Sequence, residues 1–261
     1  MATEPTDPKI EATYRRELTE GHRPMRIMRG IFRLLPHEPR CKLCNNPFAG
    51  IGGKLVAPFG FRPSRKNPNL CRRCCDTLPP GGAEVDIAVL FADVRGSTEL
   101  GERMGSTDYA ALLNHFYLTA TRVLVRHDAI VDKLIGDEVM ALFIPGFCGQ
   151  QYRHRAVDAA LDLLTGLGYG ADGNPWLPVG IGVNAGLAFV GNVGPSEMMD
   201  FTALGDAVNT AARLQGAAQA GEIIISERVY EEMPERFPNL SERELALRGK
   251  EEPVQVRVIR V

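Results

Sequence analysis

The pattern of apolar and polar residues changes character near residue 84. Beyond that point, apolar runs of strand length alternate with stretches in which apolar residues recur at helical spacing. The apolar runs predict strands at residues 85–94, 130–135, 139–144, 178–186, 187–194, 222–226, 243–248 and 254–260. The helical spacing predicts helices at residues 97–104, 107–127, 150–167, 206–219 and 227–233. This order predicts an α+β fold with an elaborated ferredoxin-like sheet over residues 84–261.

The first 36 residues predict a helical segment that is interrupted near residues 21–24. In the second half of this segment the apolar side chains share one stripe, and the arginines lie elsewhere. The stripe consists of Met25, Met28, Ile31, Phe32 and Leu35. Such a helix can lie on a membrane surface. The interpretation we favour is packing against a partner subunit or the next module.

Residues 37–78 are rich in Pro, Gly, Arg and Cys, show little periodicity and so can bury little core by themselves. They contain two CxxC pairs with 26 residues between them, namely Cys41, Cys44, Cys71 and Cys74. This resembles a zinc ribbon with a long gap, although the adjacent Cys75 leaves the register of the second pair open. A structural zinc is our first interpretation and iron–sulfur or redox sensing the second. Nucleic-acid binding is the third, because no aromatic stacking pattern is present.

Composition adds a division of charge between these parts. The 261 residues are 44% apolar and 24% charged, which is ordinary for a globular protein. Residues 1–83 carry a balance of +8 and the remainder −10, with a Pro/Gly linker expected at residues 79–83. We expect a cytoplasmic protein with no transmembrane segment, since neither a signal peptide nor a run of some 18 apolar residues is present.

Two aspartates follow long apolar strands. Asp93 ends the first strand in FADVRGST, and Asp137 lies at a hairpin tip in KLIGDEVMALF. Each alone is best interpreted as a turn cap, but together they predict a site for a divalent cation, because buried carboxylates are costly unless they are paired. With no His or Cys near, Mg²⁺ or Mn²⁺ suits the site better than Zn²⁺. The amides of Gly96, Ser97 and Thr98 open the next helix and can receive phosphate oxygens.

The helix predicted at residues 206–219 carries a second polar group. Asn209 and Arg213 stand four residues apart and so share a face, with apolar residues elsewhere. An arginine there suits a phosphate, because its planar fork of donors stays charged.

Taken together, these segments resemble the class III nucleotidyl cyclase catalytic domain. FADVRGST, DKLIGDEVMALF, TALGDAVNTAARL and LRGKEEPV occur in the family's order, over roughly residues 84–261. The resemblance implies conversion of ATP to 3′,5′-cyclic AMP and pyrophosphate. It implies two Mg²⁺ or Mn²⁺ ions per site, one assisting attack of the 3′-hydroxyl and one holding the triphosphate, with Asp93, Val94 and Asp137 as their ligands.

The resemblance also implies roles for the remaining residues. Asn209 orients the ribose, Arg213 stabilises charge on the α-phosphate, and Lys250 contacts phosphate. Lys133 stands where adenylate cyclases carry Lys and guanylate cyclases usually carry Glu. Thr202 departs from the more frequent Asp and resembles an adenylate-type subgroup with Thr, in which discrimination against GTP is expected to be looser.

In the nucleotidyl cyclase family that this sequence resembles, the metal ligands and the transition-state residues come from different subunits. One chain here carries both sets, so we expect a homodimer with two equivalent sites, regulated by the N-terminal module. The alternatives are a catalytically silent nucleotide-binding domain, which the intact site residues oppose, and a guanylate cyclase, which Lys133 opposes.

Overall fold

The computed structural model describes residues 7–21, 23–36, 38–65, 68–78, 80–170, 173–195, 199–246 and 253–261. The chain divides into two compact units. The smaller unit contains Met1–Asp86, Ile144–Gln150 and Ala188–Leu204. The larger unit contains Ile87–Phe143, Gln151–Leu187 and Gly205–Val261. Two strands, β1 and β4, begin in one unit and end in the other.

The strands follow the order β2-β3-β1-β4-β6-β8-β7, and β5 pairs with β4. They span β1 (Gly81–Val94), β2 (Ile130–Ile135), β3 (Glu138–Phe143), β4 (Val179–Val193), β5 (Asp200–Leu204), β6 (Glu222–Ser226), β7 (Ser241–Leu245) and β8 (Val254–Arg260). Pairing is antiparallel for β1 with β3, β2 with β3, and β8 with both β6 and β7, whereas β4 and β6 are parallel. The predicted α+β class is confirmed.

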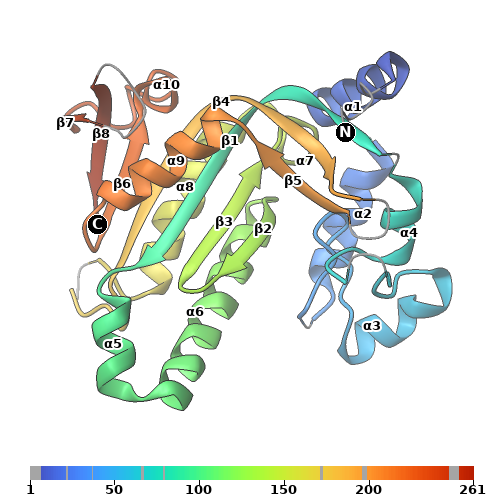
Figure 1. Cartoon of the computed structure of the whole chain (residues 1–261), viewed down its shortest axis with the longest axis horizontal. Helices are drawn as coiled ribbons and strands as arrows, with labels where there is room; N and C mark the ends of the chain where they lie inside the picture. Colours follow the sequence, from blue (N-terminus) through green and yellow to red (C-terminus); the bar gives the residue numbers. More distant parts are fainter. Residues whose placement is uncertain are drawn as a thin grey trace. The chain divides into compact units, whose positions relative to one another are not determined.

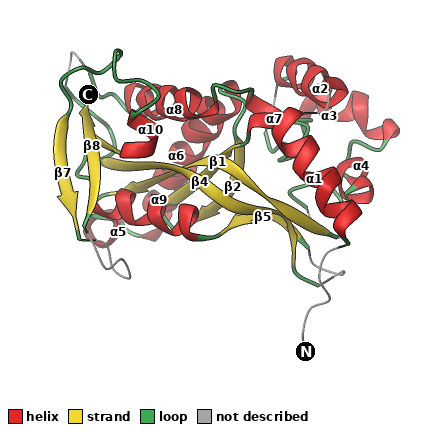
Figure 2. Cartoon of the chain, turned by 90° about the horizontal axis from the view of Figure 1, so that it is seen from above, coloured by secondary structure: helices red, strands yellow, loops and turns green. Residues whose placement is uncertain are grey.

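The helices of the larger unit are α5 (Ser97–Met104), α6 (Ser106–Arg126), α8 (Tyr152–Gly166), α9 (Asp206–Ala217) and α10 (Glu227–Tyr230). Helices α6 and α8 cover one face of the sheet, and α9 covers the other (Figure 2). The apolar side chains that recur at helical spacing in α8, namely Ala156, Ala159, Ala160, Leu163 and Leu164, are fully buried, as are Phe116 and Leu124 of α6. Helical spacing therefore identified the buried faces of these two helices correctly.

Strand β4 is one continuous strand of 15 residues, so the prediction of two strands at 178–186 and 187–194 is wrong. Two of its glycines serve close packing against α9. A Cβ added at Gly182 would lie 2.2 Å from the amide nitrogen of Gln215, and one at Gly186 would lie 3.2 Å from the Ala207 Cβ. Helix α9 thus packs directly on the backbone of β4. Any residue larger than glycine at these positions would push the helix away from the strand.

The smaller unit contains α1 (Pro8–Glu20), α2 (Arg23–Leu34), α3 (Gly50–Val56), the 3₁₀ helix η1 (Ala57–Phe59), α4 (Arg72–Thr77) and α7 (Pro145–Cys148), together with the β4–β5 hairpin (Figure 1). Helix α1 packs closely on α7, because a Cβ at Gly146 would lie 2.2 Å from the carbonyl oxygen of Glu17. In the described parts of the chain, no helix combines the length and the apolar character needed to cross a bilayer.

Helix α2 covers most of its predicted apolar stripe, since Phe32 is buried and Met25 and Met28 are partly buried, and it buries an arginine as well. Arg29 is only 1% exposed, whereas Ile31 is 57% exposed. The Arg29 guanidinium donates to the carbonyl oxygens of Lys42 (3.4 Å) and Leu43 and lies over the Phe147 ring. Buried carbonyl groups require donors, and this requirement outweighs the burial of one more aliphatic side chain.

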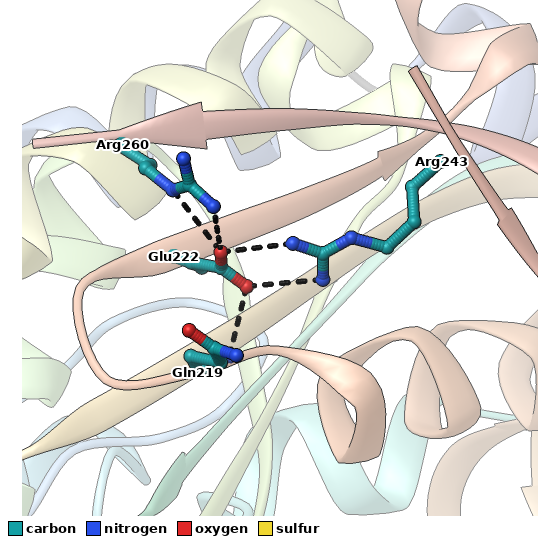
Figure 3. Close-up of polar contacts among 4 residues, drawn as sticks. All are labelled: Gln219, Glu222, Arg243 and Arg260. Carbon is teal, nitrogen blue, oxygen red and sulfur yellow. Dashed lines mark hydrogen bonds and ion pairs between the residues drawn. The ribbon is translucent and has the colours of Figure 1, made fainter. Parts of the chain in front are cut away.

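A buried glutamate joins three strands at the far edge of the sheet (Figure 3). Glu222 of β6 is 2% exposed and accepts hydrogen bonds from both terminal nitrogens of Arg243 on β7, at 3.1 and 3.0 Å. It also accepts from Arg260 of β8 at 2.9 Å and from the amide of Gln219 at 3.0 Å. Burial alone would raise the pKa of Glu222, but these donors outweigh it and hold the pKa at about 2.

Replacing Glu222 by Gln (E222Q) keeps the shape and removes the charge. We expect the free energy of unfolding at pH 7 to fall by about 2 kcal/mol, because two arginines lose their buried partner. The folded pKa of about 2 lies below the model-peptide value of 4.5, so the stabilisation is complete above about pH 5 and is lost as the pH falls toward 2. The difference between wild type and variant should shrink over that range.

Denaturant titrations at a series of pH values measure this difference. The matched control is Glu244→Gln on β7, whose side chain is exposed, and it should change stability by less than about 0.5 kcal/mol. A wild-type advantage that stays constant between pH 5 and pH 2 would contradict the charge-based explanation.

Candidate active site

Two carboxylates meet at the end of β1. Asp93 is the penultimate residue of β1 and pairs in register with Glu138 of β3, while Asp137 occupies the β2–β3 turn beside it. The amide of Val94 donates to the carbonyl oxygen of Asp137 at 3.3 Å, which draws the turn against the strand end. Gly136 has a φ of 62°, a conformation that favours glycine, and this allows the tight turn.

The charge of this pair is incompletely compensated. Burial raises the pKa of Asp93 to about 6, and the neighbouring Asp137 carboxylate adds to the rise. Arg95 and Gln215 oppose it by donating to the same Asp93 oxygen, at 2.8 and 3.0 Å. The pKa of Glu138 is also raised, first by burial and then by the two aspartates. Carboxylate oxygens with excess negative charge are the donors that a hard divalent cation prefers, so these residues fit such an ion.

The chain turns directly from β1 into α5. Gly96 has a φ of 68° and precedes Ser97, the first residue of the helix. The amide of Arg95 donates to the carbonyl oxygen of Pro178 at 2.7 Å and holds this loop to the start of β4. The amides in the first turn of a helix have no intrahelical acceptors, so those of Ser97 and Thr98 can receive an anionic group.

Helix α9 presents different groups on its two sides. Gln215 is buried, and its side-chain amide donates to Asp93, whereas Asn209 is exposed and Arg213 is half-buried. At 100° per residue, Gln215 lies about 160° around the helix from Arg213 and about 120° from Asn209. Within one chain, therefore, the expected transition-state residues point away from the side of α9 that meets Asp93.

The two base-recognition candidates lie on different strands. Lys133 of β2 follows a β-bulge, and its ammonium group is 3.0 Å from the carboxylate of buried Asp132. Thr202 is buried in β5, opposite Gly191 of β4. Lys250 lies outside the residues that the structure describes.

The four cysteines of the CxxC pairs come together in the smaller unit. The sulfur atoms of Cys41, Cys44, Cys71 and Cys74 all lie within 4.8 Å of one another. Cys75 is partly exposed and is not a member of the cluster. The register that the sequence left open is therefore the one with Cys74.

Sequence reasoning missed several residues that contact the expected ones. Gln215, Arg95 and Glu138 surround Asp93, and Asp132 holds Lys133. Gln215 carried a detectable signal, because it is a polar residue on the face of α9 otherwise formed by Ala211, Leu214 and Ala218. The other three carried none, since charged residues near strand ends are common.

The sequence profile described as the adenylate and guanylate cyclase catalytic domain matches residues 83–259, about two thirds of the chain. An adenylate cyclase from Anabaena cylindrica is 33% identical over 180 residues, which cover 65% of this chain and 36% of that protein. An uncharacterized protein from Mycobacterium tuberculosis is 32% identical over 185 residues, covering 67% of this chain and 33% of that protein. The chain thus spans about a third of the length of these relatives.

Two solved structures are similar over 68% of this chain. The guanylyl cyclase Cya2 aligns with a TM-score of 0.62 and 26% identity, over 93% of its own chain. The adenylyl cyclase CyaB from P. aeruginosa aligns with a TM-score of 0.59 and 29% identity, over 95% of its own chain. The fold, the profile match and the paired acids at the end of β1 agree, and the chain belongs to the adenylate and guanylate cyclase catalytic domain family.

Proposed function

We propose that this protein is an adenylate cyclase that converts ATP to 3′,5′-cyclic AMP and pyrophosphate at sites shared by two copies of the chain. The observation that carries the proposal is the pair formed by Asp93 and Asp137, whose charge the protein leaves incompletely compensated. A domain that binds no divalent cation has no use for such a pair, which costs stability when it holds no cation.

Asp93, Asp137 and the backbone carbonyl of Val94 would hold two Mg²⁺ or Mn²⁺ ions. When bound, such ions favour ionisation of the 3′-hydroxyl and neutralise charge on the triphosphate. Gln215 and Arg95 position the Asp93 carboxylate through their hydrogen bonds to it. The first-turn amides of Gly96, Ser97 and Thr98 would bind phosphate oxygens. Lys250 would add a further phosphate contact.

The opposed faces of α9 support sharing of the site between subunits. Asn209 would orient the ribose, and Arg213 would stabilise the negative charge that develops on the α-phosphate. Both point away from the side of α9 that contacts Asp93. A two-fold related copy can present them to the acids of its neighbour, and a closed dimer then holds two equivalent sites.

Preference for ATP rests on Lys133 and Thr202. The adenine N1 accepts a hydrogen bond and the guanine N1 donates one, so an ammonium group at Lys133 favours adenine. The Asp132 carboxylate, 3.0 Å away, orients the Lys133 ammonium group. The Thr202 hydroxyl can accept from the adenine 6-amino group. The relatives include both adenylyl and guanylyl cyclases, so guanylate cyclase activity is the alternative.

The metal assignment is tested by Asp93→Asn. We expect cyclic nucleotide formation with Mn²⁺ to fall by at least about 1,000-fold, because a lost cation ligand removes several kcal/mol of transition-state stabilisation. The pKa of Asp93 is raised in the folded protein, so its ionised form disfavours folding at pH 7 without metal. The variant's unfolding temperature without metal should therefore equal or exceed that of wild type.

The matched control is Asp76→Asn, which removes an exposed aspartate on α4 and should retain activity. Full activity of Asp93→Asn would refute the metal assignment. An inactive but normally stable Asp93→Asn protein beside a wild type that is also inactive would favour the catalytically silent alternative.

Sharing of the site is tested by mixing two inactive variants, Asp137→Ala and Arg213→Ala. Random exchange makes half of the dimers mixed, and each mixed dimer has one intact site, so about a quarter of wild-type activity should return. Each variant incubated alone under the same exchange conditions is the control. Exchange verified by mass spectrometry without recovered activity would show that the site is not shared.

Substrate preference is tested with purified protein, Mn²⁺ and either ATP or GTP. Wild type should favour ATP, and Lys133→Glu should lower the ATP rate by about 10- to 100-fold while raising the share of cyclic GMP, since it exchanges a donor for an acceptor. Lys133→Met, which only removes the donor, is the control and should lose ATP activity without gaining GTP activity. A wild type that prefers GTP would support the alternative.

A further inference from the structure

The cysteine cluster is arranged as a closed coordination site. Cys41, Cys44 and Cys71 are 0% exposed and Cys74 is 3% exposed, and none of the four forms a disulfide. Such complete burial of four thiols in a segment with little other core suggests that their sulfurs replace a hydrophobic centre with a bound ion.

Backbone amides orient the sulfurs. The amide of Cys71 donates to the sulfur of Cys41 at 3.2 Å, and the amide of Cys74 donates to the sulfur of Cys71 at 3.4 Å. The first pair is held by a tight turn, in which the amide of Asn45 donates to the carbonyl oxygen of Cys41 and Asn45 has a φ of 61°. Amide donors stabilise the thiolate form, which is the form that binds metal.

Two cationic side chains, those of Lys42 and Arg29, lie close to the first pair of cysteines. Four thiolates and one divalent ion carry a net charge of −2, which is costly to bury without cations nearby. Lys42 lies inside the first CxxC pair and is 8% exposed. The buried Arg29 donates to the carbonyl oxygens of Lys42 and Leu43. The unexpected burial of Arg29 in α2 thus has a second reason.

The spacing of the sulfurs distinguishes one ion from a cluster. A zinc–sulfur bond of 2.3 Å in a regular tetrahedron separates neighbouring sulfurs by about 3.8 Å. The sulfurs of Cys44 and Cys71 are 3.8 Å apart, and no pair among the four exceeds 4.8 Å. An iron–sulfur cluster inserts several iron and sulfide atoms between its cysteines, so it would spread the sulfurs farther apart.

The first CxxC loop, residues 41–44, also contacts β5, the strand that carries Thr202. The Lys42 ammonium group is 3.0 Å from the carboxylate of Asp200, the first residue of β5, and its side chain is 6% exposed. Asp200 stands two residues before Thr202 and pairs with Val193 of β4. Both partners belong to the smaller unit. The first CxxC loop therefore contacts the start of β5 through this ion pair, in addition to the pairing of β5 with β4.

We propose that Cys41, Cys44, Cys71 and Cys74 bind one tetrahedral zinc ion, and that this ion holds β5 in place through the Lys42–Asp200 ion pair. Because Thr202 lies on β5, this ion would also place Thr202 toward the adenine base, and that consequence rests on the role proposed above for Thr202. The zinc site and its effect on β5 do not, because neither requires nucleotide turnover.

The first test is metal content of the full chain, grown with zinc and iron both supplied. We expect one zinc and no iron per chain, and replacement by Co²⁺ should produce the visible absorption of tetrahedral thiolate-bound cobalt. Cys71→Ser should lose the metal. Cys75→Ser and Cys148→Ser, which change the other two cysteines, should keep one zinc per chain.

If Cys71→Ser fails to fold, wild-type protein still provides a test. Four cysteines should resist alkylation in the native protein and react after a chelator is added. Wild type that contains iron and sulfide instead of zinc, or that contains no metal while its four thiols stay protected, would overturn the proposal.

The second test is hydrogen exchange of residues 200–204, with residues 222–226 of β6 as the internal reference. Lys42→Met should keep one zinc per chain but speed exchange at 200–204 by about tenfold, and chelation should speed it at least as much. Unchanged exchange at 200–204 in the chelated protein would refute the link to β5. These readouts use no nucleotide, so an inactive enzyme would leave them valid.

Discussion

The close packing of α9 against the glycine positions of β4 is the constraint on which the site depends. Gly182 removes the side chain that would hold the helix away, and the close approach fixes the rotation of α9 about its axis. With that rotation, Gln215 meets Asp93 while Asn209 and Arg213 remain on the accessible side. One packing contact thus separates the two halves of the proposed chemistry, which under the proposed function a second copy of the chain would reunite.

The acids at the end of β1 cost stability, and the proposed binding of cations accounts for that cost. A protein selected for stability alone would pair Asp93 and Asp137 fully or replace them. Here burial and mutual repulsion raise the pKa of Asp93 to about 6, in spite of Arg95 and Gln215. The carboxylates are held together by the β2–β3 turn and by pairing with β3, so they cannot relax apart. Stored electrostatic free energy of this kind becomes available when a cation binds.

The smaller unit follows a different stabilising principle. Among its described residues between 38 and 78, the buried apolar side chains other than cysteine and proline are those of Leu43, Phe61 and Leu70, and the proposed zinc would take the place of apolar contacts that this segment lacks. Arg29 and Lys42 then serve two purposes, since they offset the charge of the thiolates and tie the first CxxC loop to α2 and to Asp200. An N-terminal module linked in this way to β5 could affect nucleotide selection without contributing a residue to catalysis.

The sequence by itself determined the fold class, most element positions, the presence of two CxxC pairs and the family, because these follow from local periodicity and from short motifs. It did not determine that Arg29 is buried beside the apolar stripe of α2, that β4 is one continuous strand, or whether Cys74 or Cys75 joins the cluster. Nor did it identify Gln215 as the partner of Asp93. These outcomes depend on contacts between segments distant in sequence, such as Arg29 with the carbonyl groups of Lys42 and Leu43. Only the folded chain decides which buried polar group finds its partner.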